Sequence, residues 1–335
     1  MEFKKPDYIK EIHPAFKKYF SKKYFDGQSP YPPTVQEANK YVLFEILEAD
    51  DISEIQGVIP PLNEGESPEE FTLSYPRDYY KGFNFYYWQH LTMEQKVIML
   101  YWLSEDITSE LEISPIDFCF LTKLEGAEGL HMSDVFIYQI LINPNSLEYD
   151  SSYDVVNTIA HELNHAQFSS VLQKQYMNRM NNNVYWSIER TGDTFEDIYE
   201  YIMYFCQPIE ITAEIYAYRK VCEIFKKGNQ QDKTPSLTDL VCINEQKTIL
   251  INNEKAKHVI FGDNFNKHLD LYFLLRDIEE NMESPRISLK RADELARDLE
   301  AVQAEIEKEK KQFKKNYIKF LNSELSKANT TEFSK

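Results

Sequence analysis

Apolar residues recur every three or four positions in several stretches of the chain, which is the period of an amphipathic helix. The clearest stripe, near the middle of the chain, consists of Val155, Ile159 and Leu163. Ser151 and Asp154 come just before it with the spacing of a capping box, a sequence signal for the start of a helix. The pattern therefore predicts a helix over residues 154 to about 178.

The same period and similar capping signals predict further helices. Their expected starts are Thr34 with Glu37, Thr92 with Gln95, Thr194, and Pro208, the last with Gly228 as its natural stop. Another helix is expected around Leu269, Tyr272 and Phe273. These segments make most of the chain helical.

A long amphipathic helix is predicted over about residues 286–322, opened by Ser284 and Pro285. The segment is rich in Ala, Leu, Glu, Lys and Arg and contains neither Gly nor Pro inside it. Its apolar spacing is equally typical of packing on its own domain and of an intermolecular coiled coil. The tail after Leu325 is expected to be disordered.

Two other runs have the composition of β-strands. Residues 116–124 and 135–142 are apolar and β-branched or aromatic, and they predict two strands of one sheet with a loop between them. Two shorter runs, 240–243 and 248–251, are possible strands. These runs give a fold class of α+β, mainly α-helical.

A proline-rich segment over residues 56–80 predicts a long loop. An aromatic cluster follows it, made of Phe83, Phe85, Tyr86, Tyr87 and Trp88. Aromatic side chains dominate protein cores, so this cluster is expected to pack inside the fold rather than to bind a ligand. Together the patterns predict three consecutive regions: a mainly helical region 1–110, a core 111–228 and a mainly helical region 229–335.

Composition narrows the functional classes. A net charge of −18 gives no general attraction to nucleic acid or to an anionic membrane, so neither is expected as a partner. The four cysteines have no paired spacing and are expected to be buried free thiols in a reducing compartment. The N-terminus lacks the apolar segment of a signal peptide, and no apolar run has the length of a membrane span. The expected location is cytoplasmic.

The most informative chemistry lies on the predicted central helix. His161, Glu162 and His165 belong to the sequence HELNH, which fits H-E-x-x-H. Residues four apart share one face of a helix, so His161 and His165 would direct two imidazoles toward one zinc ion. Glu162 is turned by about 100° from His161 and could reach a water molecule at the metal without binding the metal itself.

A catalytic zinc site needs a third protein ligand. Phe168 and Val171 occupy the positions at which a metzincin motif would continue with Gly and His, which excludes that class. A later helix offers Glu210 and Glu214, which are four residues apart and share a face. Two carboxylates on one helix face are costly unless something cationic lies between them.

HELNH followed by E-I-T-A-E resembles the gluzincin metallopeptidases, whose second helix carries E-x-x-x-D. The resemblance covers about residues 113–228 and implies a zincin-like core with zinc held by His161, His165 and Glu210. It also implies that Glu214 lies behind a ligand and orients a histidine, although the family usually has Asp there. In such proteins the edge of a small sheet binds a peptide substrate as an added strand.

The first hypothesis is therefore a zinc-dependent hydrolase, in particular a peptidase acting on a peptide or protein substrate, with Glu162 as the general base. The alternative is a zincin-fold binding or scaffold protein that works through its helical N- and C-terminal regions, with a partner or a second copy on the C-terminal helix. Secondary candidates for the site are Tyr216, Tyr218 and Arg219 as oxyanion-stabilising groups and His131 in the loop between the strands. Each of these is more often a structural residue.

Overall fold

The computed structural model describes residues 12–20, 34–47, 54–58, 70–74, 79–122, 129–134, 137–168, 194–228, 237–284 and 286–332. The contacts divide the chain into two compact units. Unit 1 comprises Met1–Lys174 and Thr212–Lys247, and unit 2 comprises Gln175–Ile211 and Thr248–Lys335. α8 (Pro208–Gly228) and α9 (Leu237–Phe261) each begin in one unit and end in the other, and the three consecutive regions expected from the sequence stay a prediction.

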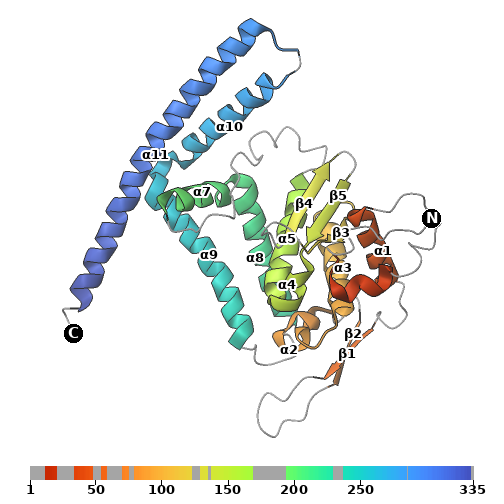
Figure 1. Cartoon of the computed structure of the whole chain (residues 1–335). Coiled ribbons are helices and arrows are strands. Elements are labelled where there is room, and N and C mark those ends of the chain that lie inside the picture. Colours follow the sequence, from red (N-terminus) through yellow and green to blue (C-terminus); the bar gives the residue numbers. More distant parts are fainter. Residues whose placement is uncertain are drawn as a thin grey trace. The chain divides into compact units, whose positions relative to one another are not determined.

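The molecule is mainly α-helical with two small sheets, as the sequence predicts for its fold class (Figure 1). The helices that lie wholly or partly in unit 1 are α1 (Val35–Leu47), α2 (Phe85–Trp88), α3 (Met93–Glu110), α4 (Pro144–Tyr149), α5 (Ser152–Phe168), α8 (Pro208–Gly228) and α9 (Leu237–Phe261), with 3-10 turns η2 (Pro14–Phe20) and η3 (Tyr79–Phe83). The expected capping boxes form at Thr34 with Glu37 and at Thr92 with Gln95.

The sheet of unit 1 that lies beside α5 has three strands in the order β3-β5-β4. β3 (Asp117–Phe120) runs parallel to β5 (Ile137–Ile142), and β4 (Gly129–Asp134) runs antiparallel to β5. α5 packs against β4 and β5, and α1 packs against β3. The prediction that the runs at 116–124 and 135–142 form strands of one sheet is confirmed over the residues that the structure describes.

The loop expected between those two strands is instead partly the edge strand β4. Its pairing runs from Gly129 opposite Ile142 to Asp134 opposite Ile137. The sequence GLHMSD contains no β-branched or aromatic residue, so the pattern gave no strand signal there. Pairing with β5 supplies the stabilisation that intrinsic preference does not.

The long loop expected over residues 56–80 is also partly wrong. β1 (Glu54–Val58) and β2 (Glu70–Ser74) pair in an antiparallel two-stranded sheet, with Ile55 opposite Leu73. The prolines that suggested a loop lie between or after these strands in the sequence, outside the described residues. This placement agrees with the rule that proline avoids strand interiors, and the strands themselves are simply short.

The core of unit 1 is built from the predicted stripe of α5 and from the aromatic cluster. Val155, Ile159 and Leu163 are buried, as are Phe83 and Trp88. At its C-terminal end α8 approaches the backbone of η3 closely. A Cβ atom at Gly228 would lie 2.8 Å from the carbonyl oxygen of Tyr80, so glycine is needed where α8 stops.

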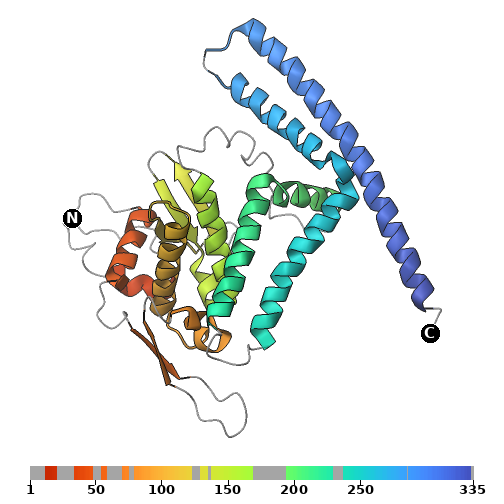
Figure 2. The ribbon, with the colours of Figure 1, turned by 180° about the vertical axis from the view of Figure 1, so that it is seen from behind.

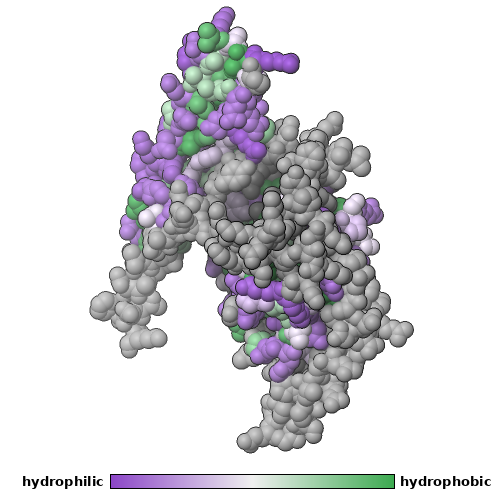
Figure 3. Space-filling view, turned by 45° about the vertical axis from the view of Figure 1, so that its right-hand side comes forward, coloured by the Kyte–Doolittle hydropathy of each residue, from purple (hydrophilic) through white to green (hydrophobic). Residues whose placement is uncertain are grey.

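Unit 2 contains α7 (Phe195–Phe205), α10 (Phe265–Met282), α11 (Leu289–Glu332), the 3-10 turn η5 (Gly262–Asn264) and the second half of α9. α10 and α11 run side by side, as both Figure 1 and Figure 2 show. The residues buried in the seam between them are Ile278, Leu295, Val302 and Ile306. At the top of Figure 3, apolar side chains of this pair lie between polar flanks. The long predicted helix therefore packs within its own unit.

Two expectations for the C-terminal third are wrong. Residues 240–243 and 248–251 are not strands but lie inside α9, where the buried positions Gln246, Asn253 and Ile260 are seven residues apart, which is two helical turns. Their β-branched composition is overridden by packing along a helix. The tail is helical as far as Glu332, because no Gly or Pro ends α11 after residue 325. No helix in the described residues is both long enough and apolar enough to cross a membrane.

Candidate metal centre

The N-terminus of α5 is fixed by hydrogen bonds on two sides. The hydroxyl of Ser151 accepts a hydrogen bond from the backbone N–H of Asp154 at 3.2 Å and donates to its carboxylate at 2.6 Å. The side-chain amide of Gln246, on α9, donates to the carbonyl of Tyr153 and to Asp154, each at 3.2 Å. Sequence analysis missed Gln246, since a residue more than ninety positions away along the chain gives no local signal.

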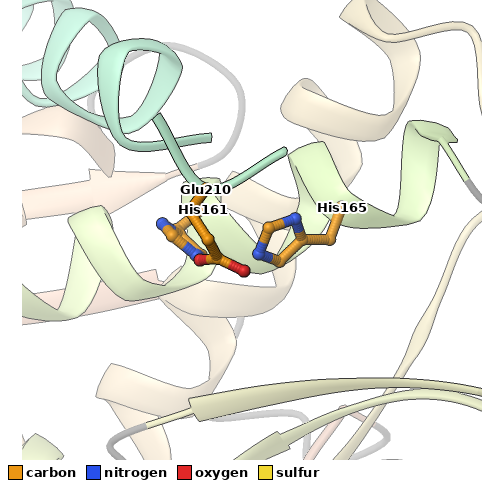
Figure 4. Close-up of side chains that lie close together, drawn as sticks. All are labelled: His161, His165 and Glu210. Carbon is orange, nitrogen blue, oxygen red and sulfur yellow. The ribbon is translucent and has the colours of Figure 1, made fainter. Parts of the chain in front are cut away.

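The two motif histidines face each other two turns further along α5. Their ring centroids are 4.5 Å apart and the ring planes are nearly perpendicular, at 89°. His161 is mostly buried, with 12% of its side chain exposed. Figure 4 shows both rings beside the carboxylate of Glu210. The helical spacing therefore brings the two imidazoles together, as predicted.

Glu210 lies in the first turn of α8, which begins at Pro208. The turn is closed by a hydrogen bond from the backbone N–H of Ile211 to the carbonyl of Gln207 at 2.9 Å. Glu210 is 3% exposed, and one ligand atom each from His161, His165 and Glu210 lie within 4.8 Å of one another. In the described part of the chain, no other three His, Cys, Asp or Glu side chains are grouped in this way.

Glu214 follows Glu210 by one helical turn and contacts His161. The carboxylate oxygen of Glu214 lies 3.1 Å from Nδ1 of His161, and 24% of the Glu214 side chain is exposed. An imidazole that donates through Nδ1 presents Nε2 to a metal, and the carboxylate fixes both the tautomer and the ring orientation. The structure thus gives the two glutamates of α8 different positions, one among the ligand atoms and one behind His161.

Glu162 is buried beside the cluster, with 8% of its surface exposed. It is the residue directly after His161 on α5, so its side chain leaves the helix about 100° around from that histidine. A carboxylate in this position is shielded from bulk water while remaining on the helix that carries both imidazoles. The arrangement suits a proton acceptor rather than a third metal ligand.

The residues present fit a zinc ion. Two imidazoles and one carboxylate are a donor set found in catalytic zinc sites, with bonds of about 2.0–2.2 Å. Ligand atoms around such an ion lie about 3.3–3.6 Å apart, so atoms already within 4.8 Å need only small side-chain movements.

The secondary candidates on α8 have other roles in the structure. The hydroxyl of Tyr216 donates to Glu110 on α3 at 3.2 Å, and burial raises the pKa of this phenol. Tyr218 interacts with Cys222, a contact that raises the pKa of Tyr218, and Arg219 is exposed. His131 lies in β4 rather than in a loop, and its side chain is outside the described residues.

The cysteines do not add to the ligand set. Cys119 and Cys206 are buried, while Cys222 and Cys242 are partly exposed, and all four are free thiols. Burial raises the pKa of both Cys119 and Cys206 to about 12, so these two groups stay protonated at neutral pH. A protonated thiol is a poor metal ligand, which leaves the histidine and glutamate cluster as the candidate centre.

No protein-family model, curated protein or solved structure matches this chain. The functional assignment therefore depends on its own side chains. By its fold and its side-chain cluster, the molecule is a mainly helical α+β protein with a candidate metal site of two histidines and one glutamate.

Proposed function

We propose that the protein is a zinc-dependent hydrolase, and specifically a peptidase with a zincin-like core. One observation carries the proposal: a ligand atom from each of His161, His165 and Glu210 lies within 4.8 Å of the others. The motif spacing alone predicts that the two histidines meet. The buried carboxylate of Glu210 lies on a separate helix, α8, so its position beside the histidines supports the zinc site independently of the motif. It completes the three protein ligands that catalytic zinc takes.

Each side chain has a distinct role in this proposal. His161, His165 and Glu210 would hold the ion, and Glu214 would keep His161 in the tautomer that presents Nε2. Zinc, when bound, supplies a Lewis acid that polarises a carbonyl group and lowers the pKa of a coordinated water molecule toward neutrality.

Glu162 is assigned to proton transfer. Its carboxylate would accept the proton of the attacking water and then donate it to the nitrogen of the leaving amine. The position of Glu162 supports this role, because it follows His161 directly on α5 and is only 8% exposed. A purely structural zinc site has no need of such a base, which is why Glu162 favours an enzyme.

The position of β4 supports a peptide as the substrate. β4 is one of the two edge strands of its sheet and packs against α5, the helix that carries the motif. An edge strand presents backbone N–H and C=O groups on its outer side, and an extended peptide can pair with them. A substrate bound in this way would run along the helix that contributes two ligands and the base.

The test compares the parent with Glu162→Gln on a peptide library read by mass spectrometry. The variant should bind zinc like the parent and cleave about 10² to 10⁴ times more slowly, because it keeps the volume of the side chain but removes the base. Glu148→Gln is the matched control, since Glu148 lies on α4 and pairs with His13 outside the site. A chelator should abolish cleavage by the parent and by the control.

Two results would contradict the enzyme proposal: no chelator-sensitive cleavage by the parent, or equal cleavage by Glu162→Gln. The second candidate function, recruitment of a partner without essential catalysis, has its own supporting observation. Ile318, Phe320 and Leu321 of α11 are exposed by 46%, 39% and 41%, respectively. If the biological activity survives Glu162→Gln, recruitment through α11 becomes the better account.

A further inference from the structure

A single buried imidazole joins three helices of unit 2. His268 of α10 is fully buried, at 0% exposure. Its Nδ1 lies 2.7 Å from a carboxylate oxygen of Glu309 on α11, and its Nε2 lies 2.5 Å from the hydroxyl of Tyr199 on α7. The hydroxyl of Tyr199 is in turn 2.9 Å from that of Tyr272 on α10.

The chemistry of these groups fixes the direction of the hydrogen bonds. An ionised carboxylate only accepts, so Nδ1 of His268 carries the proton that is donated to Glu309. In a neutral ring Nε2 then accepts from Tyr199, and Tyr199 can accept from Tyr272. Protonation at Nε2 would put two donors face to face, and both hydroxyls would have to turn. Protonation would therefore reverse the direction of these hydrogen bonds and would place a positive charge on a ring that has no exposed surface.

The surroundings of His268 also favour the neutral form. Burial lowers the pKa of His268 below its ordinary value of 6.5, and the positive charges of Lys267 and Lys310 act in the same direction. Glu309 opposes them, but Lys267 shares that carboxylate, with Nζ 3.0 Å from the other oxygen. Phe261 of α9 and Phe313 of α11 cover the ring with uncharged surface.

The remaining titratable groups around the network come from α7 and α11. They are Glu200, which lies 3.9 Å from Lys310, and Glu307, which acts on Tyr199 and Tyr272. Burial raises the pKa of Tyr199 far above its ordinary range, so this phenol does not ionise. Among these groups, His268 is the one whose ordinary pKa of 6.5 lies near physiological pH.

α7 leads directly into the turn that carries Glu210. The helix ends at Phe205, and the corner that follows is closed by backbone hydrogen bonds from Cys206 to Ile202 and from Gln207 to Tyr204. The carbonyl of Gln207 then accepts the first hydrogen bond of the Glu210 turn. Gln207 takes part both in the corner that ends α7 and in the first hydrogen bond of the Glu210 turn, so movement of α7 would be transmitted along the chain to Glu210.

We propose that His268 is an acid-sensitive clasp: its neutral ring holds α7 to α10 and α11, and its protonation releases α7 together with the turn that carries Glu210. The effect on Glu210 rests on the proposed function of the metal centre, whereas the clasp itself does not. The long helix α11 then has a role in regulation, because Glu309 orients the ring from that helix.

The sign of the pH dependence follows from the lowered pKa. A histidine held neutral in the folded state stabilises that state fully above its unfolded pKa, near 6.5, and loses this contribution as the pH falls below it. Between the folded and unfolded pKa values, each pH unit changes the opening equilibrium by up to about tenfold. Glu309, whose pKa is lowered from 4.5, adds a second loss only at more acidic pH.

The experiment is amide hydrogen exchange of the metal-free full chain at pH 7.5 and 5.5, corrected for intrinsic exchange rates. In the parent, residues 195–214 and 309–317 should exchange up to about tenfold faster at pH 5.5, and α3 should serve as an internal reference. His268→Gln cannot gain a charge and should lose this pH dependence. The matched control is His258→Gln, which alters an exposed histidine on α9 of the same unit.

The clasp is overturned if the parent exchanges equally at both pH values, or if His268→Gln keeps the full pH effect. A direct measurement covers the case in which His268→Gln does not fold. An NMR titration of the parent should show the His268 ring with a pKa below 6.5, and a value at or above 6.5 would reject the proposal.

The link to Glu210 has a separate readout, zinc affinity measured by chelator competition at pH 7.5 and 6.0. The parent should lose more affinity over this interval than His268→Gln, because the parent also opens its clasp. Equal losses would refute the link and leave the clasp to be judged by exchange. If the parent binds no zinc at all, the proposed function and the link both fail, and hydrogen exchange still decides the clasp.

Discussion

The chain contains two histidine–glutamate pairs that look alike locally and differ in what surrounds them. In both, Nδ1 of the ring faces a carboxylate, at 3.1 Å for His161 with Glu214 and at 2.7 Å for His268 with Glu309. Near His161 the next groups are a second imidazole and a buried carboxylate. Near His268 the next groups are two tyrosine hydroxyls and aromatic rings.

This difference separates a candidate metal centre from a structural clasp. A carboxylate behind Nδ1 prepares an imidazole equally well for a metal or for a hydroxyl donor. What lies at Nε2 decides between them. Additional ligands with lone pairs create a place for a cation, whereas a donating hydroxyl completes the hydrogen bonding and leaves nothing for a cation to do.

The largest expected effect is a loss of zinc affinity when a carboxylate next to His161 is removed. Glu210→Ala should reduce zinc affinity by more than the about 10–100-fold expected for Glu214→Ala, since a ligand is lost rather than a group that orients one. Chelator competition at pH 7.5 measures both variants against the parent. If Glu214→Ala releases the metal more readily than Glu210→Ala, the roles given to the two carboxylates are reversed.

A smaller effect, on the free energy of unfolding, should distinguish His268 from His161. His268→Ala should lower the free energy of unfolding of the metal-free protein by about 2–4 kcal/mol, because it removes two hydrogen bonds and leaves buried partners unsatisfied. His161→Ala should change it by less than about 1 kcal/mol, since the Glu214 carboxylate that it contacts is 24% exposed and can be solvated by water instead. Urea unfolding at pH 7.5 followed by circular dichroism compares the two, and a larger loss for His161→Ala would contradict the contrast.

Features with local causes could be predicted from the sequence. The capping boxes at Thr34 and Thr92 and the helix starts at Thr194 and Pro208 all depend on residues within one turn. The stripe of α5 was read from its spacing for the same reason. Helix ends and buried faces of this kind follow from short-range hydrogen bonding and a regular period.

Features decided by distant contacts could not be predicted. β4 exists because β5 pairs with it, and α9 is helical because its buried residues pack along one face, although both sequences suggest the opposite. The clasp at His268 joins residues from three helices, with 69 positions between Tyr199 and His268 and 41 between His268 and Glu309. Composition and spacing carry no signal for such a meeting.

The candidate metal site could be predicted in part from the sequence. The spacing of HELNH predicts that His161 and His165 share a face, and the spacing of Glu210 and Glu214 predicts the same for those two. That the two helix faces meet is a result of the fold, and the structure shows it. Which ion occupies the cluster, and whether Glu162 acts as a base, stay predictions.

The most direct test of the metal centre is the zinc content of protein purified without an affinity tag. After zinc supplementation and removal of excess metal, elemental analysis should find one zinc per chain in the parent, and His165→Ala, which removes one of the three ligands, should retain far less. Less than about a tenth of a zinc per chain in the parent would contradict the site.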